Sequence, residues 1–251
     1  RIQLPGGQPP GNFFLGVALA GKSPDTAFVK RMKSLLALPC PFVIAAAVAA
    51  LPSANAMEAS GIAQVDIAHG RLIVERSGVL KPFEVLTGAD INIGDTITAG
   101  DRAMARLLFK DNSFMNITAQ TTVRVNQYVY EPDKNAPERK RVLIIARVLK
   151  GRARFITNNV PGVSCQIHVE TDTAAVSGGA ADFVVTALPE ETWIAALISG
   201  LSVKNISNTV IGAADLHPNQ KTVVREKKPP EKPVYMTSKE RRTLIKETIV
   251  R

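Results

Sequence analysis

The side chains best suited to chemistry lie in the segment KDNSF, where Asp111 and Ser113 are separated by one residue. A carboxylate and a serine form a hydrolytic site only when a general base lies within hydrogen-bond reach of the serine hydroxyl. The chain contains His69, His168 and His217, and none of them stands in the spacing of a nucleophile elbow or a zinc site. We therefore expect structural histidines and no catalytic residues. The alternative is an enzyme that processes envelope glycan or peptide with Asp111 as acid/base beside a second carboxylate.

Metal and cofactor sites are not predicted either. Asp90, Asp95, Asp101 and Asp111 recur along the chain, but their spacing matches neither an EF-hand loop nor a nonapeptide calcium repeat. The first three each follow a glycine directly or after one alanine, which is typical of tight turns. The glycine-rich segment AVSGGAAD lacks the lysine and the Ser/Thr of a phosphate-binding loop. We expect turns at these positions and no bound cofactor.

The N-terminal region has the three parts of a secretory signal peptide. Met32 is followed by Lys33, by an apolar run and by the A-x-A sequence Ala54-Asn55-Ala56. We predict that residues 32–56 are a signal peptide, cleaved near Ala56. The mature protein is then expected in the periplasm or outside the cell. The alternative, an uncleaved anchor helix, is weakened by three prolines in or beside the apolar run.

Two further expectations follow from this prediction. Residues 1–31 are interpreted as upstream sequence translated in frame, because the first methionine of the chain is Met32. Removal of the signal peptide also removes Cys40 and leaves Cys165 as the single cysteine, so the mature chain contains no intrachain disulfide. Cys165 stands at an alternating position of SCQIHVE, which favours a buried, inert thiol over an exposed pairing thiol.

Positive charge is concentrated at the C-terminus. Residues 57–220 contain 16 Lys/Arg and 17 Asp/Glu, whereas residues 221–251 contain 10 Lys/Arg and 4 Asp/Glu, a net charge of +6. A nearly neutral core is not typical of nucleic-acid binding, so we expect no nucleic-acid partner. The basic tail, residues 221–251, is instead a candidate for contact with a surface or partner in the envelope.

The elements that would hold these side chains are almost all strands. Apolar residues alternate through much of the region 61–224, as in RAMARLLFK, where Ala103, Ala105, Leu107 and Phe109 share one face. Only ETWIAALISG is also compatible with a short helix. Gly88, Gly94 and Gly100 are six residues apart, and turns this close together allow only very short strands. The sequence predicts an all-β domain over residues 57–224, a compact β-solenoid or roll of short strands; a β-sandwich is the alternative.

A different composition begins after this domain. Residues 225–236 contain three prolines among charged residues, which predicts a stiff linker resembling polyproline. In residues 237–251, Thr237 and Glu240 have the spacing of a capping box. We predict a short, basic, amphipathic helix there, which would need a packing partner because an isolated helix of this length is marginal.

The order of motifs from about Gly61 to Phe183 resembles the FecR domain family. Two Gly-Asp turns precede an alternating strand, a corner of the Asp-Gly-Ser type follows, and a Lys-Gly-x-x-Arg-Phe segment comes later. The positions that carry the resemblance, all expected to be structural, are Gly94, Asp95, Gly100, Asp101, Leu107, Phe109, Asp111, Asn112, Ser113, Gly151, Phe155 and Phe183.

The chain departs from the family at two motifs. The corner reads Asp111-Asn112-Ser113, and asparagine is the residue that most readily replaces glycine in a left-handed turn. The family's Arg-Gly-Thr motif is absent near Gly178–Ala181, which removes any contact that this arginine makes in relatives.

The resemblance also has consequences for function. FecR-like signal regulators of the bacterial envelope carry a cytoplasmic sigma-binding domain and a transmembrane helix before the domain, whereas a signal peptide is predicted here. The resemblance therefore implies a stand-alone exported member, to which sigma-factor regulation does not simply transfer. We expect a non-enzymatic binding, regulatory or structural module whose partner is an envelope protein or a cell-wall glycan.

Overall fold

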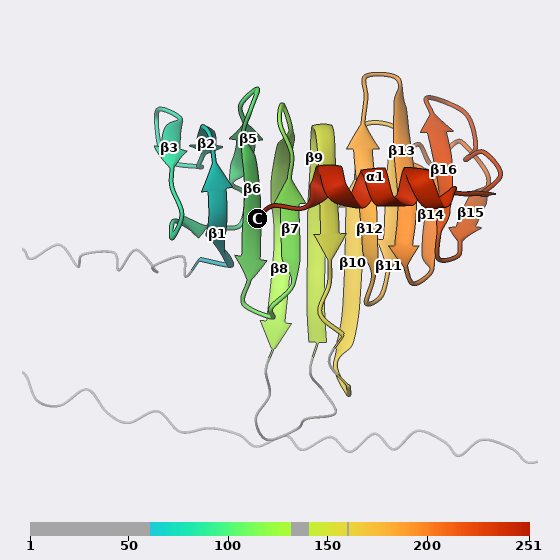
Figure 1. Cartoon of the computed structure of the whole chain (residues 1–251), viewed down its shortest axis with the longest axis horizontal. Coiled ribbons are helices and arrows are strands. Elements are labelled where there is room, and N and C mark those ends of the chain that lie inside the picture. Colours follow the sequence, from blue (N-terminus) through green and yellow to red (C-terminus); the bar gives the residue numbers. More distant parts are fainter. Residues whose placement is uncertain (1–60, 132–140, 160) are drawn as a thin grey trace, which may run out of the picture. The chain divides into compact units, whose positions relative to one another are not determined.

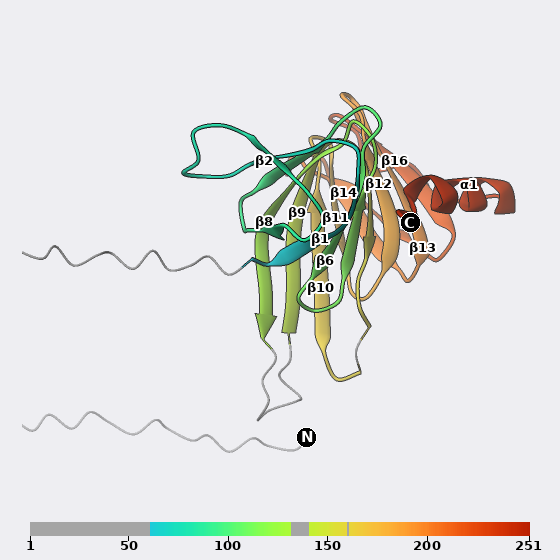
Figure 2. The same ribbon diagram turned by 60° about the vertical axis from the view of Figure 1, so that its left-hand side comes forward.

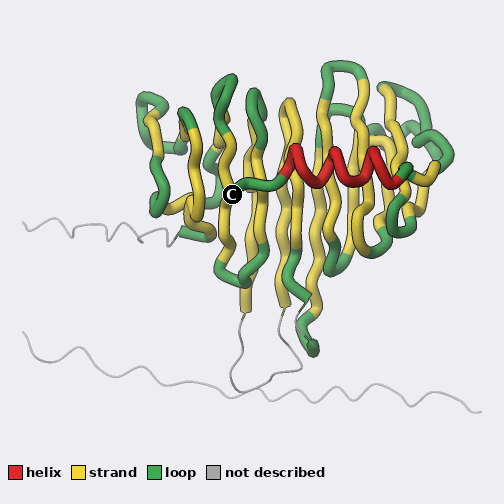
Figure 3. Tube along the Cα trace, viewed as in Figure 1, coloured by secondary structure: helices red, strands yellow, loops and turns green. Residues whose placement is uncertain are grey.

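A computed structural model describes residues 61–131, 141–159 and 161–251. The predicted signal peptide, residues 32–56, and the upstream segment, residues 1–31, lie outside the described residues. The described chain is mostly β, with one short helix near its C-terminus (Figure 3). The predicted β class and the predicted C-terminal helix are therefore confirmed. ETWIAALI forms a strand, which settles the one segment that was also compatible with a helix.

The strands form an open mixed sheet that is folded into two layers (Figure 2). We call the layer beneath the C-terminal helix layer 1. Its strands, in order of hydrogen-bonded neighbours, are β4 (Asp90–Ile91), β1 (Ala63–His69), β6 (Met104–Phe109), β7 (Phe114–Ile117), β9 (Arg141–Ile156), β12 (Asp182–Ala187), β13 (Glu191–Ile198), β16 (Gln220–Arg225) and β17 (Val234–Tyr235).

Layer 2 lies behind layer 1 and shares β9 with it. Its strands, in order, are β3 (Phe83–Val85), β2 (Leu72–Glu75), β5 (Thr96–Ala99), β8 (Thr122–Glu131), β9, β10 (Ser164–Glu170), β11 (Ala174–Gly178), β14 (Leu201–Asn205) and β15 (Ala213–Leu216). The chain passes repeatedly between the layers through tight turns. Among these pairings only β9 and β10 run parallel, whereas stacked coils of a parallel β-helix pair in parallel throughout. The sheet is therefore mixed, with mostly antiparallel pairing.

The shared strand changes layer at Gly151. Residues 141–150 of β9 pair with β8 and β10 in layer 2, and residues 151–156 pair with β7 and β12 in layer 1. Gly151 has φ +84°, and a Cβ atom there would lie 2.6 Å from the Cα atom of Thr121. Only glycine fits both the left-handed backbone and this close approach.

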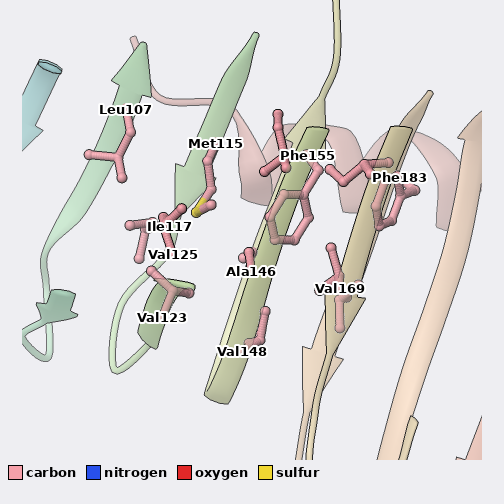
Figure 4. Packing of buried hydrophobic residues seen from close by; sticks show 14 of the residues in the cluster. Leu107, Met115, Ile117, Val123, Val125, Ala146, Val148, Phe155, Val169 and Phe183 are labelled. Carbon is pink, nitrogen blue, oxygen red and sulfur yellow. The ribbon is translucent and has the colours of Figure 1, made fainter. Parts of the chain in front are cut away.

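One hydrophobic core fills the space between the layers (Figure 4). Phe155 of β9 and Phe183 of β12 are paired in register and stack with their ring centroids 5.3 Å apart. Leu107, Met115 and Val125 pack into the same core, and none of their surface is exposed. Every second residue of a strand therefore faces the space between the layers, as the period-two pattern predicts.

The segment RVLIIARVLK, residues 141–150, is apolar on both faces, but only one face of this part of β9 is buried. The inward residues Val142, Ile144, Ala146 and Val148 are buried. The outward Leu143 and Ile145 are only half-buried, because this part of β9 lies in layer 2 and the helix covers layer 1.

Part of the predicted linker belongs to the sheet. Val234 and Tyr235 form β17 and pair with Lys221 and Gln220 of β16. Helix α1 (Ser238–Thr248) follows and runs across the strands of layer 1 (Figure 1). Among the described residues, no helix is both long and apolar enough to cross a membrane.

Candidate functional site

The Asp111 corner is a buried hydrogen-bond node between β6 and β7. The Tyr128 hydroxyl donates to Asp111 Oδ1 at 2.9 Å, and the Ser113 hydroxyl donates to Asp111 Oδ2. The backbone amide of Asp111 in turn donates to the Tyr128 oxygen at 3.0 Å. Asn158 also belongs to the node. Its backbone amide donates to Ser113 Oγ, and its side-chain amide donates to the backbone carbonyl of Asp111.

This geometry does not make Ser113 a nucleophile. Its proton is directed to Asp111, and both carboxylate oxygens of Asp111 already accept hydrogen bonds. Burial, and then the charge of Asp111, raises the pKa of Tyr128 above its usual value, so Tyr128 stays a neutral donor. The node ties β8 and residue 158 to the corner.

Asn112 occupies the left-handed position that the sequence assigns to it. Its φ is +63°, its side chain is exposed, and its amide donates to the carbonyl of Phe109 at 2.9 Å. We predict that Asn112→Gly changes the free energy of unfolding by less than about 1 kcal/mol and tends to stabilise, because glycine adopts this φ without strain. Asn112→Val should cost about 1–2 kcal/mol, because a β-branched residue is strained there. Thermal melts of the two variants measure this contrast, and a clear drop in Tm for the glycine variant would contradict it.

Asp95 does more than form the predicted turn. It is fully buried, and both of its carboxylate oxygens accept hydrogen bonds from Arg76, at distances from 2.7 to 3.2 Å. The amide of Asn92 also donates to Asp95 Oδ2 at 2.8 Å, which closes the local turn. The carboxylate thus ties the turn before β5 to the residue that follows β2, a link the sequence did not predict.

The other acidic residues do not converge on a cation site. Asp101 accepts a hydrogen bond from Gln120 at 3.2 Å, and Asp95 and Asp111 have the separate partners described above. Within residues 61–131, 141–159 and 161–251, no group of three or more His, Cys, Asp or Glu side chains is placed to hold a metal ion.

The three histidines lie in different parts of the fold. His69 contacts the carbonyl of Arg251 at 2.6 Å, His168 contacts Ser177 and Glu170, and His217 is exposed in a turn. The contacts of His69 and His168 are made with other residues of the same chain. Cys165 is half-buried beside the core, and burial raises the pKa of its thiol, which makes it a poor nucleophile.

The Lys-Gly-x-x-Arg-Phe segment has three separate structural roles. Gly151 is the point at which β9 changes layer, and Phe155 enters the core. Arg154 points to the opposite face of layer 1 and forms two hydrogen bonds with Asp182 of β12, at 2.8 and 2.7 Å. The missing Arg-Gly-Thr motif falls in the turn between β11 and β12, where Gly179 and Ala180 stand.

The C-terminal segment crosses the outer face of layer 1, which points away from layer 2 (Figure 1). Asn116 of β7 donates to the carbonyl of Thr248 at 2.8 Å, and Arg152 of β9 pairs with Glu247 at 2.5 Å. Thr248 is fully buried by this packing. The predicted amphipathic helix therefore finds a packing partner within its own chain.

The other end of α1 is held through Glu240. Glu240 completes the predicted capping box with Thr237 and pairs with Lys221 of β16 at 2.7 Å. The hydrogen bond from Lys221, followed by those from the amide and hydroxyl of Thr237, lowers the pKa of Glu240 to about 2. Glu240 is therefore ionised at neutral pH, and the contact between α1 and β16 is a charged pair.

A groove of about 400 Å³ remains between α1 and layer 1. Its apolar lining is drawn from several elements: Val184 of β12, Leu188 of the β12–β13 turn, Trp193 of β13, Met236 and Leu244. Trp193 is the only tryptophan of the chain and is 40% exposed. A concave apolar site bordered by a few polar groups is the usual form of a ligand site. We call it the Trp193 groove, and it is the candidate functional site.

Sequence reasoning did not find this groove. In ETWIAALI, Thr192 and Ile194 are buried and Trp193 lies between them, so period two places the tryptophan on the outer face. A large aromatic residue at an outward position was the available signal. The second wall of the groove comes from Met236 and Leu244, whose position opposite β13 cannot be read from local pattern.

Comparisons with known proteins agree with the motif order. A model of the family described as FecR protein matches residues 95–198, which contain β5 to β13. No curated protein matches the chain. Two crystal structures described as "a putative anti-sigma factor" from Parabacteroides distasonis match with TM-scores of 0.41 and 0.42, at 16% and 15% sequence identity. Each alignment covers 59% of this chain and 62% of the solved chain, which is less than two thirds of that chain's length.

The matched range begins later and ends later than the region in which the motifs were recognised. Strands β1 to β4 and β14 to β17 lie outside it and extend both layers, and α1 also lies outside it. The motif order and the family match agree on the segment from Asp95 to Phe183. The chain therefore contains a FecR domain, over residues 95–198.

Proposed function

We propose that this chain is an exported, non-enzymatic FecR-like module that binds a component of the bacterial envelope and acts in regulation or in structural assembly. The FecR domain supports a binding or regulatory role, since the family is generally not catalytic. The predicted signal peptide, residues 32–56, supports a place in the periplasm or outside the cell. The partner is an envelope protein or a cell-wall glycan.

The Trp193 groove is the observation that carries this proposal. The polar groups of the family motifs are occupied by partners within the chain, as the Asp111 node and the Arg76–Asp95 pair show. The groove, in contrast, holds apolar side chains and a partly exposed tryptophan open to a ligand. Aromatic side chains in concave sites provide much of the binding free energy in protein recognition.

The basic tail offers a second contact surface, separate from the groove. Lys239, Arg242 and Lys246 are exposed on the side of α1 that faces away from layer 1, and none of them lines the groove. Their positive charge suits an acidic group of an envelope component. The tail thus keeps the contact role proposed for residues 221–251 while its helix stays docked.

Site-specific photo-cross-linking in intact cells tests the proposal. A photoreactive amino acid at Leu188, which is 43% exposed at the groove, is expected to give a defined adduct with an envelope component. The matched control is the same amino acid at Leu80, which is fully exposed on the turn between β2 and β3. Equal labelling from both positions, or none from Leu188, would argue against a binding role for the groove.

A further inference from the structure

We propose that the Trp193 groove binds an uncharged sugar ring, of the N-acetylated hexosamine class found in cell-wall glycans, with the ring stacked on the indole of Trp193. This inference rests on the proposed function and specifies the ligand class of the same site. It is argued from the size of the groove, the setting of the tryptophan and the charge balance of the rim.

The size of the groove favours one ligand unit over a broad protein interface. Stable protein–protein contacts bury about 800 Å² on each partner. On the outer face of layer 1, α1 and the chain end already pack across the middle of the strands, so this face is not one uninterrupted flat surface. The Trp193 groove beside α1 has a volume of about 400 Å³, in the range of small-molecule sites.

The tryptophan is oriented by a hydrogen bond within its own strand. Trp193 Nε1 donates to Glu191 Oε1 at 2.8 Å, so the indole is oriented by a neighbour on its own strand. Its polar edge is satisfied by this bond, while part of its apolar surface faces solvent. A flat apolar surface of this kind suits the C–H face of a pyranose, and the apolar floor around Val184 and Leu244 suits an acetamido methyl group.

The rim of the groove carries charges that are already paired. Lys221 is bound to Glu240 at 2.7 Å, and Arg152 is bound to Glu247 at 2.5 Å. Because each cation has a carboxylate partner, the rim offers no net charge for an anionic ligand. It does offer carboxylate acceptors and N–H donors at the edge of an apolar pocket, which is the pairing that sugar hydroxyl and amide groups require.

The sole tryptophan gives a direct test on the full chain. Titration with chitotetraose, a neutral oligomer of N-acetylglucosamine, is expected to give a saturable change in Trp193 emission. Calorimetry of Trp193→Ala should show binding weakened by about tenfold or more, equivalent to about 1.4 kcal/mol, and Trp193→Phe should retain most of it. Ile198→Ala, an exposed position on the same strand outside the groove, is the matched control and should bind normally.

The remaining outcomes separate the ligand class from the function of the groove. A saturable response to decanoate and none to chitotetraose would overturn the sugar assignment in favour of an acyl ligand. The absence of a response to chitotetraose, combined with cross-linking of a protein from Leu188, would overturn it in favour of a protein anchor and leave the proposed function standing. The absence of both responses and of any Leu188 adduct would defeat the proposed function as well.

Discussion

Asp182→Ala is expected to lower the free energy of unfolding by about 3–5 kcal/mol, because it leaves a buried guanidinium without its carboxylate. Arg154 and Asp182 are 7% and 8% exposed, and two hydrogen bonds of 2.8 and 2.7 Å join them across β9 and β12. Arg154 Nη1 is buried without a partner among the described residues, so Asp182 supplies most of the compensation for this charge. Urea denaturation of the variant measures the loss.

The matched control is an arginine–aspartate pair at the surface. Arg147 and Asp172 are joined at 2.9 Å, but their side chains are 41% and 58% exposed. Asp172→Ala should therefore cost no more than about 1 kcal/mol. The double variant Arg154→Met with Asp182→Leu should regain most of the stability lost in Asp182→Ala, because it removes both charges together. If Asp182→Ala and Asp172→Ala cost the same, the buried pair does not have the role assigned to it.

Gly151→Ala is expected to destabilise the fold by at least about 3 kcal/mol, and the soluble yield should fall with it. Two effects add at this position. The φ of +84° is strained for any residue with a Cβ atom, and that atom would lie 2.4 Å from Thr121 Oγ1 and 2.6 Å from Thr121 Cα. The contact with a backbone atom cannot be relieved by a side-chain rotation, so β9 or the β7–β8 turn must move.

Gly88→Ala separates the two effects. Gly88 has φ +90°, similar to that of Gly151, but a Cβ atom there would meet no atom within 4 Å. Its substitution should cost only the conformational strain, about 1–2 kcal/mol. Comparison of the two melting temperatures then measures the cost of the close approach where β9 changes layer. Equal losses would show that the approach of Gly151 to Thr121 is not a tight one.

Local features were predicted well where one residue and its neighbours decide the structure. The left-handed Asn112, the capping box of Thr237 and Glu240, and the alternation from Ala103 to Phe109 all depend on backbone geometry over a few residues. The order of such features along the chain also indicated a FecR domain, which the match to residues 95–198 confirms. Each of these signals is a local propensity, and local propensity is what a single sequence expresses most directly.

Predictions were incomplete where a side chain reaches a distant partner. The sequence predicts a turn at Asp95, and Asp95 also binds Arg76, 19 residues earlier. Arg154 stands in the Lys-Gly-x-x-Arg-Phe motif, and it binds Asp182, 28 residues later. A strand pattern shows which face of a residue's own strand is buried, but it does not identify the neighbouring strand or the register that sets its partners.

Local sequence patterns are enough to predict that this chain forms short strands with one buried face each, that tight glycine and asparagine turns join them, and that a capped helix follows the strands. Long-range packing, in contrast, places β9 in both layers, packs α1 on layer 1 and leaves a groove with Trp193 between them. The contact between Arg152 and Glu247 spans 95 residues of sequence. Such contacts depend on the free energy of the whole packed arrangement, in which many weak pairings across the two layers are satisfied together, and no single segment carries that information.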